Sequence, residues 1–155
     1  MSEIKKNEDY PLREFVTMMI GEQVFGISVT YVMDVLLPQE INATPLARRE
    51  VLGSLNLRGR VVTAIDIRHS LNIKESVNLK KSIYVVIEYK SELYSLIVDE
   101  VHDVINIPVE KVQENPENLN KFWQKISLGI YPVENELVVI LDINKVMDDL
   151  MIITK

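Results

Sequence analysis

The chain carries one sequence pattern twice, and this repeat limits the folds that are open to it. Residues 24–35 match residues 93–104 without a gap, and residues 52–67 match residues 128–143 in the same way. Two copies of one pattern predict two similar substructures that share a core. Turns vary more freely than the elements that they connect, so a turn that differs between the copies is the best candidate for a functional site.

The composition excludes several classes of protein. With 155 residues, of which 47% are hydrophobic, the chain can bury one substantial core. It has no cysteine, which excludes disulfide bonds and thiol chemistry and favours the cytoplasm. A net charge of −6 argues against nucleic acid and against an anionic membrane surface as partners. No apolar run approaches the roughly 18 residues of a membrane-spanning helix, so direct membrane insertion is not expected.

Short apolar runs between turn residues predict a mainly β protein. The strands expected in the first copy, about residues 13–72, cover residues 14–20, 24–27, 53–57 and 60–65. Those expected in the second copy, about residues 82–150, cover residues 83–88, 93–98, 126–133 and 137–141. We expect two small β-barrels in a single domain of residues 12–150, preceded by a flexible arm at residues 1–11. The polar residues 73–81 are the expected link between the copies.

Short helices are expected between some of these strands. Ser28 is a good N-cap, and Val29, Val32 and Met33 follow it at helical spacing. In the second copy, residues 101–107 are expected to pass from helix to strand. Whether the two copies exchange strands is left open by the sequence.

Asp66 and Asp142 occupy matching places in the two copies, each directly after a strand. Helix capping explains both positions: Asp66 would cap a short helix that ends near residue 72, and Asp142 the closing helix. The closing helix has an apolar face made of Ile143, Val146, Met147 and Leu150. Two carboxylates also suit general acid–base catalysis, so a small barrel enzyme or ligand-binding module is an alternative.

Other signs of enzymatic chemistry are missing from the sequence. The two histidines, His69 and His102, do not stand at a spacing typical of metal ligands, and the five glycines form no phosphate-binding loop. Trp123 lies among loop residues and is expected to anchor a small satellite cluster. We therefore expect no catalytic residue, cofactor or metal site.

The turn that differs between the copies is residues 56–59, for which the second copy has residues 132–135. Asn56 and Gly59 suit a tight turn, because glycine adopts a positive φ without strain. A turn does not require an arginine, so Arg58 needs another explanation. It is either solvated or paired with Glu134 or Asp34, or it is presented to a partner protein.

Residues 53–62, followed by residues 65–68, resemble the signature of the CheW family, whose members connect chemoreceptors to the histidine kinase CheA. The resemblance continues in residues 96–101, at Gly129 and in residues 137–142, and it covers about residues 14–150. It implies two SH3-like five-stranded β-barrels around a continuous core, built from an internal duplication. CheA itself would require further domains, so a free-standing adaptor without enzymatic activity is expected.

The resemblance also implies roles for individual residues. Receptor-binding residues would be Val32, Asn56 and Arg58, and kinase-binding residues would be Val29, Asp34 and Gly53. Apart from the resemblance, the residues themselves predict structural roles for Gly59, as a turn residue, and for Asp66 and Asp142, as caps. The chain departs from the family pattern at Leu52, Asp34 and Ser95, where lysine, glutamate and glycine are common, and Arg48-Arg49 stands in a stretch that is commonly proline-rich.

The partners implied by the resemblance are the regulatory domain of CheA and the cytoplasmic tips of chemoreceptors. The protein would be a cytoplasmic monomer that is recruited to membrane-associated receptor arrays. The sequence does not decide whether it forms rings within those arrays. The alternative within the same class is an adaptor for a kinase pathway of surface motility.

Overall fold

The computed structural model describes residues 12–44 and 50–154 of the chain. The expected N-terminal arm and the Arg48-Arg49 pair lie outside the described residues. No helix in the described part has the length and apolarity that a bilayer crossing requires.

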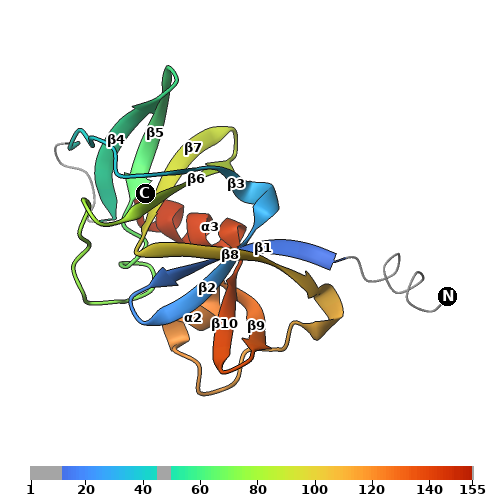
Figure 1. Cartoon of the computed structure of the whole chain (residues 1–155). Helices are drawn as coiled ribbons and strands as arrows, with labels where there is room; N and C mark the ends of the chain where they lie inside the picture. The colour runs from blue at the N-terminus through green and yellow to red at the C-terminus, as the bar shows by residue number, and fades with distance from the viewer. Residues whose placement is uncertain (1–11, 45–49, 155) are drawn as a thin grey trace.

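The described residues form two five-stranded sheets (Figure 1). Sheet A has the order β8-β1-β2-β10-β9, and sheet B has the order β3-β6-β7-β5-β4. Sheet A consists of β1 (Leu12–Ile20), β2 (Gln23–Ser28), β8 (Glu100–Pro108), β9 (Ser127–Val133) and β10 (Glu136–Leu141). Sheet B consists of β3 (Val32–Leu36), β4 (Val51–Leu57), β5 (Arg60–Ile65), β6 (Ile83–Tyr89) and β7 (Glu92–Val98). The other elements are the 3-10 turns η1 (Val29–Tyr31) and η2 (Val109–Lys111) and the helices α2 (Lys121–Ile126) and α3 (Ile143–Thr154).

Each sheet contains strands from both sequence copies. The first copy gives β1 and β2 to sheet A and β3, β4 and β5 to sheet B, and the second copy does the reverse. Replacing each strand of sheet A by its counterpart in the other copy reproduces the strand order of sheet B. The copies are joined by two equivalent parallel pairs, β2 with β10 and β5 with β7. The predicted mainly β fold with two five-stranded units is therefore confirmed, and the copies do exchange strands.

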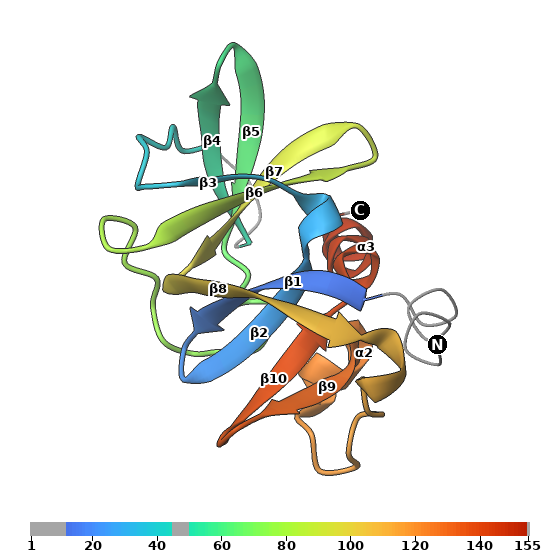
Figure 2. The same cartoon turned by 45° about the vertical axis from the view of Figure 1, so that its right-hand side comes forward.

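One continuous core lies between the sheets. It combines Met18 and Phe25 from sheet A with Ile87 and Leu96 from sheet B, all of them fully buried. Helix α3 lies between the two sheets (Figure 2) and adds its buried apolar face to this core. That face is the predicted one, made of Ile143, Val146, Met147 and Leu150.

One backbone bridge, made of two hydrogen bonds, joins the two edges of each sheet. Beyond edge strand β3, Asn42 exchanges two backbone hydrogen bonds, 2.8 and 2.9 Å long, with Ser54 on the opposite edge strand β4. Gln113 and Ile130 make the same bridge, at 2.8 and 2.9 Å, in sheet A. Each sheet is thereby joined edge to edge, as in a small barrel.

Three expected helices are strands or turns in the structure. After Ser28 the chain makes only the single 3-10 turn η1 and continues as β3, which pairs with β6. Residues 101–107 lie within β8, which pairs with β1, and the segment after Asp66 consists of successive turns. Segments rich in valine and isoleucine fit a pleated sheet better than a helix, and the neighbouring strand supplies their backbone hydrogen bonds.

Helix α2 was not expected from the sequence. Its N-terminus is capped by Asn120, whose Oδ1 accepts a hydrogen bond from the backbone N–H of Phe122 at 2.9 Å. The helix places the Trp123 ring edge-on against Phe25, with 5.2 Å between ring centroids, and its Nε1–H donates to the carbonyl of Leu71 at 2.8 Å. Trp123 therefore packs against the main core rather than anchoring a satellite cluster.

The buried hydroxyl of Ser95 generates a prediction about stability. Ser95 is fully buried in β7, and its Oγ has no hydrogen-bond partner among the described residues. Ser95→Ala removes an unpaired polar group, so we expect the free energy of unfolding in urea to rise by about 1 kcal/mol. Ser82→Ala is the control and should lower it by about 1 kcal/mol, because the Ser82 hydroxyl donates to the carbonyl of Asn78 at 2.6 Å. A loss of stability in Ser95→Ala would mean that this hydroxyl is paired in solution.

Candidate functional site

The distinctive turn, residues 56–59, closes the β4–β5 hairpin. Leu57 pairs with Arg60 across the hairpin, and Arg58 and Gly59 form the loop with φ values of +52° and +84°. Positive φ at both loop residues is typical of the tight turn that suits twisted strands. Asn56 holds the turn through its side chain, whose Oδ1 accepts the backbone N–H of Gly59 at 2.9 Å. The sequence therefore identified the turn chemistry correctly, and the structure adds that Arg58 itself adopts a conformation uncommon outside glycine.

Arg58 pairs with Asp34 on β3. Its Nη2 lies 3.3 Å from Asp34 Oδ2, so of the two acids considered from the sequence Asp34 is the partner. The Arg58 side chain is 80% exposed and that of Asp34 27% exposed. An exposed ion pair of this kind contributes about 0–1 kcal/mol. Arg58 is therefore weakly held, and the predicted receptor-binding arginine touches a predicted kinase-binding residue.

A small hollow of about 120 Å³ lies beside this ion pair. Its apolar lining comes from Met33, Leu57, Val86 and Leu93, and its charged lining from Asp34, Arg58 and Arg60. An apolar surface next to two guanidinium groups can receive an apolar side chain and an anionic group together.

A larger groove of about 560 Å³ lies at η1. Val29 lines it together with Phe15, Leu141 and Ile143. Val32, the next predicted contact, is half-buried and packs against the main core. Residues 29–36, which are η1 and β3, therefore run from this groove to Arg58 as one strip, which we call the η1–β3 strip.

The sequence missed the apolar row on the outer side of this strip. Met33, Val35 and Leu37 alternate along the chain with more buried neighbours and are exposed at its surface. Alternation is the signal of a half-buried strand and could have identified the row, but the helical spacing of residues 29–33 obscured it.

Gly53 is buried on β4 and has a reason within the fold for being glycine. A Cβ at this position would lie 2.2 Å from the backbone oxygen of Asn42, and φ is +145°. Gly129 repeats this geometry in sheet A, where a Cβ would lie 2.3 Å from the oxygen of Gln113. Close approach of two backbones does explain the glycine, but both backbones belong to this chain. A side chain at position 53 would therefore disturb the fold itself, while a kinase contact near Gly53 stays a prediction.

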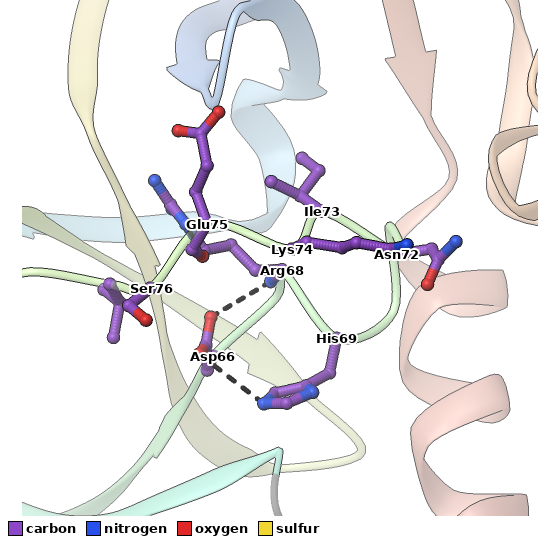
Figure 3. Close-up of a pocket in the computed structure, with 9 residues that line it drawn as sticks. Asp66, Arg68, His69, Asn72, Ile73, Lys74, Glu75 and Ser76 are labelled. Carbon is purple, nitrogen blue, oxygen red and sulfur yellow. Dashed lines mark hydrogen bonds and ion pairs between the residues drawn. The ribbon is translucent and has the colours of Figure 1, made fainter.

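Asp66 and Asp142 act as local caps. Asp142 Oδ1 accepts the backbone N–H groups of Asn144 and Lys145 at the start of α3, at 3.0 and 3.3 Å. Asp66 Oδ1 accepts the N–H of Arg68 at 3.1 Å and thereby holds a turn rather than a helix. The other oxygen of Asp66 lies 3.7 Å from His69 Nε2 (Figure 3).

The two carboxylates face separate hollows. Asp66 lines one of about 430 Å³ formed within residues 66–77 (Figure 3), and Asp142 lines the groove at η1. A catalytic pair would have to share one pocket, so the arrangement favours capping over acid–base chemistry.

The counterpart turn in sheet A lacks the features of residues 56–59. Glu134 takes the place of Arg58 with φ +50°, and Pro132 takes the place of Asn56. The counterpart of Asp34 is Asp103, so two acids stand where sheet B has an ion pair. The asymmetry seen in the sequence is thus an asymmetry of charge at equivalent places in two similar sheets.

Two tyrosines of the β6–β7 hairpin in sheet B have raised pKa values. Burial raises the pKa of Tyr94 to about 12, and the hydrogen bond from its hydroxyl to Glu92 acts in the same direction. The hydroxyl of Tyr89 donates to Asp148 on α3, and this hydrogen bond, followed by burial, raises the pKa of Tyr89. The two rings pack edge to face, with 6.4 Å between their centroids.

Comparisons with known proteins agree with this geometry. A family model described as the CheW-like domain matches residues 14–151. The chemotaxis protein CheW of Bacillus subtilis (strain 168) is 31% identical over 147 residues, which cover 95% of this chain and 91% of that protein. The chemotaxis protein CheW of Rhizobium meliloti (strain 1021) is 25% identical over 134 residues and covers 86% of both chains.

A solved structure shares the fold. The crystal structure of the scaffolding protein TtCheW from Thermoanaerobacter tengcongensis matches with a TM-score of 0.76 and 24% sequence identity. The match covers 84% of this chain and 89% of that one. It therefore supports the arrangement of the two sheets.

The close contact at Gly53 predicts an order of stability among glycine variants. Gly53→Ala and Gly129→Ala should each lose about 3 kcal/mol or more of unfolding free energy, because strain and a backbone clash add. Gly59→Ala should lose only about 1–2 kcal/mol, the cost of a left-handed conformation, because a Cβ there meets no atom within 4 Å. Urea denaturation of the three variants measures these losses. A loss in Gly53→Ala no greater than in Gly59→Ala would contradict the described approach of Asn42.

The raised pKa of Tyr94 predicts a loss of stability at high pH. The folded protein favours the neutral phenol, so its contribution is complete below the ordinary pKa of 10.0 and is lost as the pH rises to about 12. Denaturation midpoints measured across this range should fall as the pH rises, and less steeply in Tyr94→Phe. Equal slopes in the two proteins would show that Tyr94 ionises as an ordinary tyrosine.

Proposed function

Because the chain belongs to the CheW-like domain family, we propose that it is a non-enzymatic adaptor that couples chemoreceptors to the histidine kinase CheA in chemotaxis. The observation that carries this proposal is the charge asymmetry between two similar sheets. Only one of the two equivalent hairpins presents an exposed arginine, and that arginine stands at the end of an apolar strip. An adaptor needs surfaces that bind particular partner proteins, and it does not need a catalytic group.

The receptor contact is proposed along the η1–β3 strip. A helical receptor tip can place its apolar face on this strip, which is a common mode of peptide recognition. A carboxylate or a helix C-terminal carbonyl of the tip can then accept hydrogen bonds from Arg58. The hydrogen bond from Gly59 N–H to Asn56 restrains the backbone of the turn that carries Arg58, so less backbone entropy is lost on binding. Asn56 would thus act by positioning Arg58.

The kinase contact is proposed around Val29 in η1, Asp34 on edge strand β3 and Gly53 on edge strand β4. Edge strands β3 and β4 meet there through the bridge from Asn42 to Ser54. The exposed row of Met33, Val35 and Leu37 offers apolar area for a domain of similar fold. Since Asp34 pairs with Arg58 through an exposed contact, the two proposed partner contacts lie next to each other.

The remaining parts of the proposal concern location and assembly. The adaptor is proposed to be a cytoplasmic monomer that joins membrane-associated receptor arrays through its two partners, and rings would form only within arrays. The relatives reported above carry names from chemotaxis, so the surface-motility pathway has no observation in its favour. The enzyme alternative is disfavoured by the separate hollows of Asp66 and Asp142.

Arg58→Ala tests the receptor contact. Loss of a desolvated charge-assisted contact costs about 2–5 kcal/mol of binding free energy, whereas the pair with Asp34 contributes about 0–1 kcal/mol to stability. We therefore expect weaker binding to a receptor-tip fragment in calorimetry, with the melting temperature and CheA binding nearly unchanged.

Glu134→Ala is the matched control, since it removes a charged side chain from the equivalent turn of sheet A. It should change receptor binding much less than Arg58→Ala does. Equal losses in the two variants would defeat the claim that the asymmetry marks the site. A large drop in the melting temperature of Arg58→Ala would instead assign the arginine a structural role.

A further inference from the structure

The chain passes between the two sheets at two equivalent places. It goes from sheet A to sheet B through η1, and it returns from sheet B to sheet A at Asp99, between β7 and β8. The repeat aligns Thr30, in the middle of η1, with Asp99. At these two crossings the chain links two similar sheets covalently. The side chains at the two crossings differ.

The crossing at Asp99 is tied to three other segments. Asp99 Oδ1 accepts a hydrogen bond from Arg68 Nη2 at 2.6 Å, and Oδ2 accepts the backbone N–H of Gly21 at 2.7 Å. Its backbone N–H donates to the carbonyl of Met19 at 2.9 Å. Met19 and Gly21 belong to β1 and the β1–β2 turn of sheet A, while Arg68 follows β5 of sheet B. One carboxylate thus holds both sheets together.

Arg68 is buried beside Asp99 and is held there by several contacts. Its side chain is only 5% exposed, and its Nε donates to the carbonyl of Glu75 at 3.1 Å. Its Nη1 is buried without a hydrogen-bond partner among the described residues. Figure 3 shows Arg68 beside Glu75, below the β1–β2 hairpin. Ile73 closes the contact, since a Cβ on Gly21 would lie 3.3 Å from its Cγ2.

Among the described residues, the crossing at η1 has no such set of hydrogen bonds. Thr30 stands where the other crossing has Asp99, and its exposed hydroxyl reaches only Ser28 Oγ, at 2.9 Å. Asn144 stands where the other half has Arg68, and it donates an exposed hydrogen bond to the Tyr31 hydroxyl at 3.2 Å. One crossing is therefore held by the buried Arg68 paired with the partly buried Asp99, whereas the other is held chiefly by apolar packing of Val29 and Tyr31 against the main core.

We propose that the Arg68–Asp99 ion pair is the fixed pivot of the two sheets and that changes in their relative orientation open and close the η1 side. Apolar contacts have no preferred direction and tolerate small sliding, while a partly buried ion pair with several hydrogen bonds favours one geometry. The freedom is then confined to the groove that Val29 lines. Arg68 and Asp99 thereby become positioning residues for the partner surface, a consequence that rests on the proposed function.

Distances between spin labels test the pivot in the free protein. The chain has no cysteine, so Glu14→Cys on β1 and Glu88→Cys on β6 give two unique exposed attachment points, one in each sheet. Asp99→Asn and Arg68→Met should each broaden the measured distance distribution about twofold, a change typical of a released hinge. Tyr31→Phe removes the polar contact of the other crossing and is the matched control, which should leave the width unchanged. Unchanged widths in folded Asp99→Asn and Arg68→Met would overturn the proposal.

Amide hydrogen exchange gives a second test that needs no variant. The N–H groups of Gly21 and Asp99 should exchange at least about tenfold more slowly than those of Thr30 and Val32 at η1, because local opening is confined to the η1 side. Equal exchange rates at the two crossings would overturn the proposal even if the variants failed to fold.

Binding separates this proposal from the proposed function. Asp99→Asn should bind a receptor-tip fragment about tenfold more weakly, because fewer molecules hold the groove in its binding geometry. Broader distances without weaker binding would overturn the positioning role. If the unaltered protein bound no receptor-tip fragment, the proposed function would fail, and the distances and exchange rates would still decide the pivot.

Discussion

Strand exchange between the two sequence copies is the constraint on which the rest of the structure depends. Each copy supplies two strands to one sheet and three to the other, so neither sheet can form until both copies are present. The parallel pairs of β2 with β10 and β5 with β7 join residues far apart in the chain. The core between the sheets is consequently continuous, and the chain is expected to unfold as one unit. Exchange also places β3 of the first copy beside β6 of the second, which creates the edge that carries Met33 and Asp34.

The proposed function depends on the positions at which the two similar sheets carry different side chains. Sheet B pairs Arg58 with Asp34, where sheet A has Glu134 and Asp103. Sheet B therefore carries an arginine at this turn, whereas the equivalent positions of sheet A carry acids.

The crossings between the sheets are unequal as well. A partly buried ion pair holds the chain at Asp99, while a groove lies at the counterpart, Thr30. The ion pair lies at the crossing at Asp99, and the proposed partner surface lies at the other crossing, η1. The copies thus keep equivalent backbones and differ in the charges that those backbones carry.

The sequence predicted what depends on neighbours in the chain. The β4–β5 hairpin, the turn held by Asn56 and the cap at Asp142 are local, and each is confirmed. Residues 29–33 satisfied a helical spacing over too few residues to exclude alternation, and the non-local pairing of β3 with β6 decided the outcome. Strand exchange could not be predicted, because the two copies offer equivalent strands. For the same reason Asp34 and Glu134 were equal candidates as partners of Arg58 until β3 was placed in sheet B.

The central claim is that a receptor binds sheet B at the η1–β3 strip and the turn of residues 56–59, and that it does not bind the equivalent place in sheet A. Amide chemical shifts of the labelled protein, recorded while a receptor-tip fragment is added, test this claim most directly. The account predicts the largest changes in residues 29–36 and 56–60 and none above background in residues 132–136. Changes centred on residues 132–136, or spread equally over both hairpins, would contradict it.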